Sequence, residues 1–332
     1  MTERWTWHGG GLSAARAHFG EHQDGWLDLS TGINPHAWPA ALTVAIDWRG
    51  LPDETELRTL EEAAAGHFRC DPAYVCAVPG TEVGLRLCGE FLPAPARHVT
   101  PTYRTHGEML AGSVAIAIDE VAKADASTLI IANPNNPDGR LLDHQTLIDL
   151  LARRDFGSAA QSWLVIDESF ADCHPDNSLA NIVDDSRRLI IFRSFGKFFG
   201  LAGLRLGFVL APRAFIARLR HKLGAWPVSA AAIAIGTAAY RDLEWIRHTR
   251  ERVASEASEL EQVLHARGYV VRGKCPLYRL IECKTAHPLF EHLAKRAILT
   301  RPFRENPRWL RVGLPGSRGA FCRFIAALPD HG

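Results

Sequence analysis

The amino-acid sequence predicts an α/β protein whose large domain contains a mostly parallel sheet of seven strands, beside a smaller α+β domain. Seven short runs between residues 74 and 210 are rich in Val, Ile and Leu without strict polar alternation, which is typical of strands covered on both faces. Amphipathic segments such as 81–91 and 143–153 separate several of these runs. Repeated strand–helix–strand order favours a doubly wound sheet with flanking helices.

The individual elements follow from these patterns. The expected strands of the large sheet span residues 74–78, 98–100, 114–118, 128–132, 163–167, 189–193 and 206–210. One long helix is expected over 229–268, and shorter elements follow it: strands 278–283, 298–301 and 309–312, a helix over 288–296 and a last helix. We therefore expect residues 41–235 to form the large domain and 236–332 the small domain, with residues 1–40 contributing to the small domain and to a substrate site.

Composition excludes several classes of partner. The 332 residues carry 38 basic and 37 acidic side chains, a formal charge of +1, so no overall field attracts nucleic acid or an anionic membrane. The first residues lack the basic and apolar regions of a signal peptide, and the charge-free stretch 225–240 is too short to span a bilayer. Seven cysteines without a C-x-x-C pair indicate reduced thiols, and no metal-ligand spacing is present. We expect a cytoplasmic protein without a metal.

Polar and glycine-rich segments follow four of the predicted strands. In an open α/β sheet, ligands bind beyond the carboxyl ends of the strands, so one site is predicted at this edge. The segments are Gly80-Thr81-Glu82, Asn133 to Gly139, Asp167-Glu168-Ser169-Phe170, and Ser194-Phe195-Gly196-Lys197 with Arg205 eight residues later.

An anion site is predicted where Gly80 and Thr81 begin a helix. Free backbone N–H groups and the positive end of the helix dipole favour phosphate there. Ser194 and Arg205 could add a hydroxyl and a bidentate guanidinium. A plain strand–helix turn is the alternative interpretation of Gly80.

Two charged residues at strand ends need an explanation. Asp167 ends a buried strand and requires a cationic partner, for which a protonated pyridine nitrogen, a helix N-cap or an internal salt bridge are the candidates. Lys197 lies in a stretch rich in Gly and Phe with no acidic residue within five positions. Such surroundings can make a lysine an amine nucleophile, although an isolated lysine is more often a surface residue.

Three segments together resemble the fold-type I pyridoxal-phosphate enzymes related to aspartate and histidinol-phosphate aminotransferases. They are N-P-N-N-P-D-G (133–139), D-E-S-F (167–170) and S-F-G-K-F-F-G-L-A-G-L-R-L-G-F (194–208), in the family's order and spacing. The resemblance covers essentially the whole chain. It implies a homodimer in which the large domain binds pyridoxal 5′-phosphate.

The resemblance also implies a role for each site residue. Lys197 would carry the cofactor as a Schiff base and Asp167 would pair with the pyridine nitrogen. Tyr103 would lie over the ring, and these three form the expected catalytic set. Asn136 would face the ring 3′-oxygen. Thr81, Ser194 and Arg205 would hold the phosphate, and Gly80 and Glu82 complete the expected cofactor-binding set.

Two positions depart from the family pattern. Phe170 stands where the family commonly has tyrosine, so one hydrogen bond to the 3′-oxygen should be missing. The segment Arg49-Gly50-Leu51-Pro52-Asp53 has Leu51 in place of a tyrosine that reaches the phosphate from the partner subunit. The loop is retained, but it offers no tyrosine for this contact.

The amino terminus separates branches of the family. Histidinol-phosphate aminotransferases typically show N-E-N-P, whereas this chain has Gly32-Ile33-Asn34-Pro35 after an early His8-Gly9-Gly10. This combination looks like the branch that decarboxylates O-phospho-L-threonine to (R)-1-amino-2-propanol phosphate in cobalamin biosynthesis. By this resemblance the substrate contacts are His8, Gly9, Asn34, Asn136, Arg301 and Arg311.

A phosphorylated amino acid has two anionic ends, and Arg301 and Arg311 end consecutive predicted strands. Arg311 matches the family's carboxylate-binding arginine, and Arg301 could bind phosphate or share the carboxylate. Both could instead be solvated arginines, and His8 could belong to a tail without function. An aminotransferase acting on histidinol phosphate or a related amino acid is the alternative function. A non-catalytic binding module is disfavoured because Lys197, Asp167, Asn136 and Arg205 are all present.

Overall fold

The computed structural model describes residues 3–123, 127–156 and 162–330. The chain divides into two compact units. The small unit consists of Met1–Ala37, Pro137–Arg140 and Thr249–Gly332, and the large unit consists of Trp38–Asn136 and Leu141–His248.

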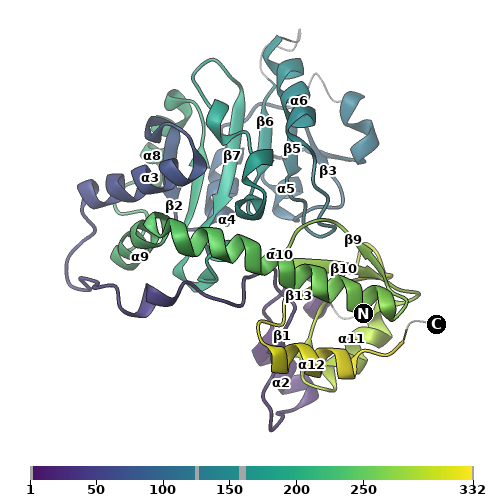
Figure 1. Cartoon of the computed structure of the whole chain (residues 1–332). Helices are drawn as coiled ribbons and strands as arrows, with labels where there is room; N and C mark the ends of the chain where they lie inside the picture. Colours follow the sequence, from purple (N-terminus) through teal and green to yellow (C-terminus); the bar gives the residue numbers. More distant parts are fainter. Residues whose placement is uncertain (1–2, 124–126, 157–161, 331–332) are drawn as a thin grey trace. The chain divides into compact units, whose positions relative to one another are not determined.

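A seven-stranded sheet forms the centre of the large unit, in the order β2-β8-β7-β6-β5-β3-β4 (Figure 1). Its strands are β2 (Val75–Val78), β3 (Ala96–Val99), β4 (Val114–Ile116), β5 (Thr128–Ala132), β6 (Leu164–Asp167), β7 (Leu189–Ser194) and β8 (Gly207–Leu210). All neighbours pair in parallel except β8, which is antiparallel to β2 and β7. The predicted mostly parallel α/β sheet is thus confirmed.

Helices cover this sheet and connect its strands. They are α3 (Glu54–Phe68), α4 (Thr81–Gly89), α5 (Thr105–Glu108), α6 (His144–Phe156), α7 (Phe195–Phe198), α8 (Arg213–Leu223) and α9 (Ala230–Arg241). Short 3-10 turns lie at Pro39–Leu42, Pro72–Tyr74, Ile118–Lys123, Ala171–Cys173, Pro175–Asn177, Ala180–Ile182 and Ala202–Leu204.

The prediction of one helix over 229–268 is wrong. Helix α9 ends at Arg241 and α10 (Leu243–Ala266) begins after Asp242. The Asp242 side chain accepts hydrogen bonds from the backbone N–H of Trp245 and from Trp38 Nε1, both at 3.0 Å. A side-chain oxygen that binds a first-turn N–H is a helix N-cap, so Asp242 starts a new helix rather than continuing the old one.

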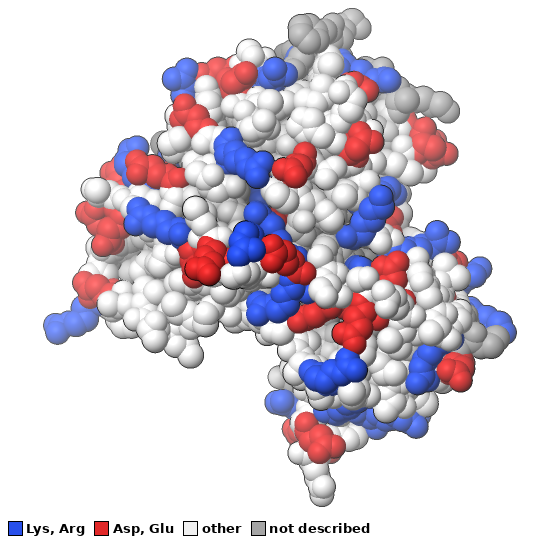
Figure 2. All heavy atoms as spheres, viewed as in Figure 1, with Lys and Arg blue, Asp and Glu red and all other residues white. Residues whose placement is uncertain are grey.

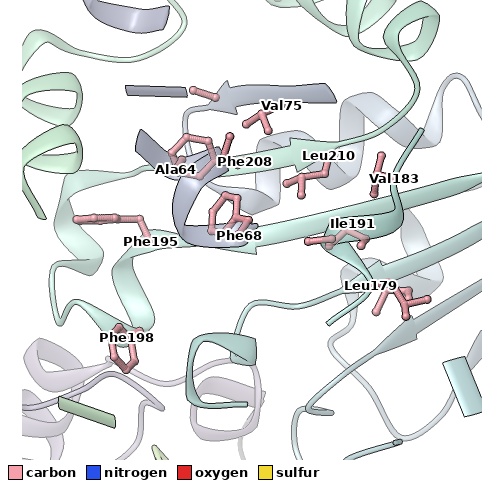
Figure 3. Close-up of a cluster of buried hydrophobic side chains, with 14 of the residues drawn as sticks. Ala64, Phe68, Val75, Leu179, Val183, Ile191, Phe195, Phe198, Phe208 and Leu210 are labelled. Atoms are coloured by element: carbon pink, nitrogen blue, oxygen red, sulfur yellow. The ribbon is translucent and has the colours of Figure 1, made fainter. Parts of the chain in front are cut away.

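The apolar core of the large unit packs between the sheet and the helices, as Figure 3 shows for Phe68, Phe195 and Phe208. Helix α9 packs on α3, and a Cβ built on Gly236 would lie 2.8 Å from Leu60 Cδ1. This close approach places α9 with the large unit. The division of the chain therefore falls after His248 rather than at the expected residue 236.

The small unit contains a four-stranded antiparallel sheet in the order β12-β13-β10-β9. Its strands are β9 (Val270–Arg272), β10 (Tyr278–Glu282), β12 (Arg301–Pro302) and β13 (Trp309–Gly313), while β1 (Leu27–Asp28) pairs in parallel with β11 (Ile298–Leu299). Helices α1 (Glu3–Thr6), α2 (Leu12–Phe19), α11 (Ala286–Ala294) and α12 (Arg318–Ala327), together with the part of α10 from Thr249 onward, complete it. The single strand expected over 298–301 divides at Thr300, because β11 and β12 pair in different sheets.

Basic and acidic side chains are interspersed on the face drawn in Figure 2, in keeping with a formal charge of +1. Among the described residues, no helix is both long and apolar enough to cross a membrane.

Candidate active site

An anion cradle lies where β2 leads into α4. Gly80 has a φ of 86°, and a Cβ at this position would lie 2.5 Å from Nη2 of Arg205. Only glycine therefore lets the guanidinium approach the start of α4 so closely. The first N–H groups of a helix have no acceptor within the helix. The guanidinium and the amides of Thr81 and Glu82 thus lie close enough to hold one phosphate group.

The neighbouring strands contribute to the same cradle. Ser194 and Gly207 are opposite each other in the β7–β8 pair, and a Cβ at Gly207 would lie 2.7 Å from the Thr81 nitrogen. The structure therefore brings together Gly80, Thr81, Ser194 and Arg205, which the sequence separates by up to 125 residues.

Asp167, at the end of β6, is a buried carboxylate with three hydrogen-bond donors. His106 Nε2 lies 2.8 Å from its Oδ2, and the Ser169 N–H and hydroxyl donate to its Oδ1 at 2.9 and 2.5 Å. Burial alone raises the pKa of Asp167, but the hydrogen bonds from His106 and Ser169 hold it below its ordinary value. A carboxylate has about four lone-pair sites, so this anion can accept one more donor.

His106 was not anticipated from the sequence. It is fully buried on α5, and its Nδ1 lies 2.7 Å from the hydroxyl of Thr102. His106 and Asp167 are 61 residues apart, so no local spacing signals their contact. The sequence left open an internal salt bridge for Asp167. The structure gives Asp167 a buried contact of this kind, with a histidine as the partner.

Lys197 lies on the short helix α7 among buried phenylalanines. Its Nζ is 5.9 Å from the centre of the Phe170 ring, and its side chain is only partly buried. A Cβ at the preceding Gly196 would lie 2.5 Å from Ala202 Cα, so α7 packs tightly on the segment that leads to Arg205. The amine and the anion cradle are thus held by one rigid connection between β7 and β8.

Tyr103 and Glu82 interact directly. The Tyr103 hydroxyl donates to Glu82 Oε2 at 3.0 Å, and Thr105 and Arg86 donate to the same carboxylate. Burial, and then the Glu82 charge, raise the pKa of Tyr103. The Glu82 side chain therefore orients Tyr103, and its backbone N–H, in the first turn of α4, has no acceptor within the helix.

The asparagines after β5 have separate tasks. The Asn133 side chain exchanges two hydrogen bonds with the backbone of Leu142, and Asn135 Nδ2 donates to the Pro101 carbonyl at 2.8 Å. These bonds shape the loop. Asn136 is partly buried and is the last residue of this segment of the large unit.

Two arginines are paired in the small unit. Arg301 on β12 and Arg311 on β13 are directly opposite each other across the strands, although like charges in this relation repel. Arg311 is buried, its Nη2 donates to the Ser30 carbonyl at 2.8 Å, and its guanidinium lies 5.0 Å from the Tyr278 ring centre. Burial lowers the pKa of Arg311. Two arginines at paired positions of one sheet are suited to a ligand with more than one negative charge.

The amino-terminal residues lie against the same part of the small unit. A Cβ at Gly9 would lie 2.3 Å from the Ser30 carbonyl oxygen, which also binds Arg311. His8 is exposed and hydrogen-bonds the Gly9 carbonyl, whereas Asn34 is buried and accepts from the His36 N–H. The structure thus brings Gly9 and Arg311 together through Ser30, while the His8 and Asn34 side chains have local partners.

The structure also shows the surroundings of the two residues that depart from the family pattern. Phe170 is buried beside Lys197, and its ring offers no hydrogen bond. The Leu51 side chain is 70% exposed, and Asp53 of the same segment caps α3 by accepting from Thr55 and Glu56.

Comparison with known proteins is consistent with this geometry. The model of the aminotransferase class I and II family matches residues 98–327. Threonine-phosphate decarboxylases from Sinorhizobium sp. and Pseudomonas aeruginosa are 40% and 36% identical to this chain, which in both cases covers at least 96% of each protein. The structure of histidinol-phosphate aminotransferase from Sinorhizobium meliloti, in complex with pyridoxal-5′-phosphate, superimposes with a TM-score of 0.80 at 19% identity, covering 97% of this chain and 94% of that one. This chain belongs to the class I and II aminotransferase family.

Proposed function

We propose that this protein is a pyridoxal-phosphate-dependent decarboxylase that converts O-phospho-L-threonine to (R)-1-amino-2-propanol phosphate and carbon dioxide, a step of cobalamin biosynthesis. The observation that carries the choice of reaction is the 40% identity to a threonine-phosphate decarboxylase over 97% of both chains. The geometry of each unit supports the cofactor and the substrate class.

The residues of the large unit fit pyridoxal phosphate. The cradle formed by Gly80, Thr81, Ser194 and Arg205 suits its phosphate, and Lys197 supplies the amine that holds it. Asp167 remains anionic and can accept one further donor, which matches a protonated pyridine nitrogen. When bound, the cofactor supplies an electron sink for the bond that breaks at the substrate Cα.

The small unit offers the two positive charges that a phosphorylated amino acid requires. Arg311, buried and held by Ser30 and Tyr278, is the better preorganised group and binds the carboxylate. Arg301, partly buried beside the Phe303 ring, binds the phosphate or shares the carboxylate. Gly9 and Asn34 shape the amino-terminal side of this site, and His8 and Asn136 contact the substrate.

These residues determine which bond breaks. The protein selects one of the bonds at Cα by fixing the orientation of the substrate, and the two arginines do this through its charged ends. After carbon dioxide leaves, Lys197 in its ammonium form donates a proton to Cα in place of the lost carboxylate and is left as the free amine, because it is the acid–base group expected nearest that atom. Asp167 stays ionised throughout and favours the form of the cofactor that accepts electrons.

A direct assay distinguishes the candidate functions. Incubation with O-phospho-L-threonine should release carbon dioxide while the cofactor absorbance returns to its starting value. Accumulation of pyridoxamine phosphate with histidinol phosphate as the substrate would instead establish the aminotransferase. If purified protein shows no absorbance from bound cofactor, or if Lys197→Ala leaves that absorbance unchanged, the enzyme hypothesis is wrong.

The arginine roles predict a difference between two matched variants. Arg311→Lys should lower kcat/KM for O-phospho-L-threonine about 100-fold, because a lysine cannot form the bidentate contact with a carboxylate. Arg301→Lys should lower it less, about tenfold, because an ammonium still binds phosphate as a point charge. Steady-state kinetics with both variants tests this, and equal losses would contradict the assignment.

We also infer a homodimer that works in the cytoplasm. Leu42, Trp48 and Leu51 are 96%, 78% and 70% exposed, and this apolar segment contains the loop that faces the partner subunit in the family. The structure describes all seven cysteines, and no disulfide joins them, in keeping with a reducing compartment. Light scattering of the purified protein should give about twice the monomer mass of 36.7 kDa, and a monomer would contradict the dimer.

A further inference from the structure

Four charged or titratable side chains form a closed cluster in the large unit that the proposed mechanism does not use. Arg193 Nη1 donates to Glu168 Oε2 at 2.9 Å and its Nη2 donates to Asp172 Oδ1 at 2.6 Å. His67 Nε2 lies 2.8 Å from the same Asp172 oxygen. All four side chains are at most 3% exposed. We call Arg193, Glu168, Asp172 and His67 the buried ion network.

The network contacts the chain next to two of the residues that would touch the cofactor, Asp167 and Lys197. Glu168 directly follows Asp167, and Arg193 lies four positions before Lys197. On the other side of Lys197, the His67 ring lies 6.2 Å from the ring of Phe199. Because side chains alternate along a strand, Arg193 points away from the face on which Ser194 joins the anion cradle. The network therefore lies behind the site and not in it.

The same network anchors the loop that follows β6. Glu168 accepts from the Ser178 hydroxyl at 2.6 Å and from the Leu179 N–H at 3.2 Å. Its own N–H donates to the Phe192 carbonyl on β7 at 2.9 Å. The ends of β6 and β7 are thus joined by one backbone bond and by the Arg193–Glu168 pair.

Stability alone does not account for such an arrangement. Removing several charges from water is costly, and apolar side chains that fill the same space often give equal or greater stability. What an arginine between two carboxylates does provide is a fixed geometry, because its planar fork binds both in defined directions. Catalytic groups need this, since small displacements of a reacting group cost much of the rate.

We propose that the buried ion network is a positioning device, in which Arg193 sets the position of Asp167 relative to Lys197 by holding the ends of β6 and β7 together. The inference rests on the proposed function only for the roles of Asp167 and Lys197 in catalysis. The claim that Arg193 holds the ends of β6 and β7 together concerns the large unit alone and does not depend on that function.

A matched control exists at the opposite end of β7. Arg154, on α6, is also buried, and its Nη1 donates to the Leu150 carbonyl at 2.7 Å. Its carbonyl accepts from Arg188, which directly precedes β7. Arg154→Met therefore removes a buried arginine from the same unit without touching the carboxyl ends of the strands.

The test compares Arg193→Met and Arg193→Lys with Arg154→Met in full-length protein. Hydrogen exchange of the peptides spanning 164–170 and 189–199, measured by mass spectrometry without cofactor, should become about tenfold faster in Arg193→Met. With pyridoxal phosphate bound, its kcat should fall about tenfold at nearly constant KM, and the pH midpoint of the cofactor absorbance should move by about half a unit. Arg193→Lys should recover part of each change, because one ammonium can pair with only one carboxylate at a time.

Arg154→Met should lower the unfolding midpoint while leaving exchange at both peptides and the absorbance midpoint unchanged. Equal behaviour of Arg154→Met and Arg193→Met would overturn the proposal and reduce Arg193 to a stabilising residue. If Arg193→Met does not fold, Arg193→Lys carries the comparison. If the wild-type protein binds no pyridoxal phosphate, the proposed function fails, and the exchange measurement alone decides whether the network positions the strand ends.

Discussion

The carboxyl ends of β6 and β7 carry two clusters of polar side chains on opposite sides, and the two clusters are built differently. On the site side, Asp167 accepts three hydrogen bonds from His106 and Ser169 and keeps room for one more donor. On the other side, the Arg193 guanidinium pairs with both Glu168 and Asp172 of the buried ion network. A binding site leaves a hydrogen-bond acceptor available to a ligand, whereas a structural support uses its charged groups for contacts within the protein.

The neighbouring residues Asp167 and Glu168 show this difference most directly. Burial raises the pKa of both carboxyl groups. Around Asp167 this effect is outweighed by His106 and Ser169, whereas around Glu168 it is only partly offset by Arg193 and Ser178. Adjacent positions in the sequence thus acquire different charge properties from their tertiary partners.

The largest expected effect is a loss of activity without a loss of stability when Lys197, on the site side, is replaced. Lys197→Ala should reduce decarboxylation about ten-thousandfold or more, because it removes the group that we propose to hold the cofactor and to move the proton. The apoprotein should unfold at nearly the same denaturant concentration as the wild type, since Lys197 is only partly buried. Carbon dioxide release and urea unfolding measure the two quantities. A large loss of stability would show that Lys197 of the candidate site also supports the fold.

The comparison of Asp167 with Glu168 predicts the next largest effect. Asp167→Asn should lower kcat about 100-fold, because an amide cannot stabilise a protonated pyridine nitrogen as an anion does. Glu168→Gln should lower kcat less than about tenfold, since it acts on the site only through the strand ends. Steady-state kinetics of the two isosteric variants provides the measurement. A larger loss of kcat in Glu168→Gln than in Asp167→Asn would refute the assignment of Asp167 to the site and of Glu168 to the structural support.

The support side should respond to pH in a defined direction. Burial alone raises the pKa of Asp172, but Arg193 and His67 hold it well below the ordinary value of 3.8. The ionised carboxylate therefore stabilises the fold above about pH 4, and this contribution disappears as the pH falls through the lowered value. Asp172→Asn should cost about 3 kcal/mol of unfolding free energy at pH 7.

Urea unfolding of Asp172→Asn and wild type at a series of pH values tests this direction. The difference in unfolding free energy between wild type and Asp172→Asn should be constant from pH 7 to pH 5 and should shrink below pH 4. A difference that grows in acid would mean that Asp172 is not the ionised member of the pair.

The smallest expected effect concerns the ring that lies on the site side. Tyr103→Phe keeps the aromatic face and removes only the hydrogen bond to Glu82. One hydrogen bond in a partly exposed place contributes about 1 kcal/mol or less, so the Kd for pyridoxal phosphate should rise about two- to fivefold. Fluorescence titration of the apoprotein measures it. Tyr103→Ala is the matched variant, and it should weaken binding further because the stacking surface is lost.

Much of the large unit could be predicted because its signals are local. Apolar runs and the polar residues after them located all seven strands and placed Asp167 and Lys197 at strand ends. The antiparallel direction of β8 was not predictable, since it depends on how residues 195–206 return along β7. The break at Asp242 has a local signal in its capping side chain, but it was obscured by helix-forming residues on both sides.

The amino-acid sequence by itself determined the α/β class and the family, and it predicted most of the residues proposed to bear chemistry, because these depend on residue type, order and spacing. Only the tertiary structure decided which donors Asp167 meets, which arginines face each other in the small unit, and that Arg193 joins two carboxylates behind the site. Other contacts of this kind join residues far apart in the sequence, such as Arg311 and Ser30, which are 281 positions apart. They are decided by packing and strand register, for which a single sequence carries no local signal.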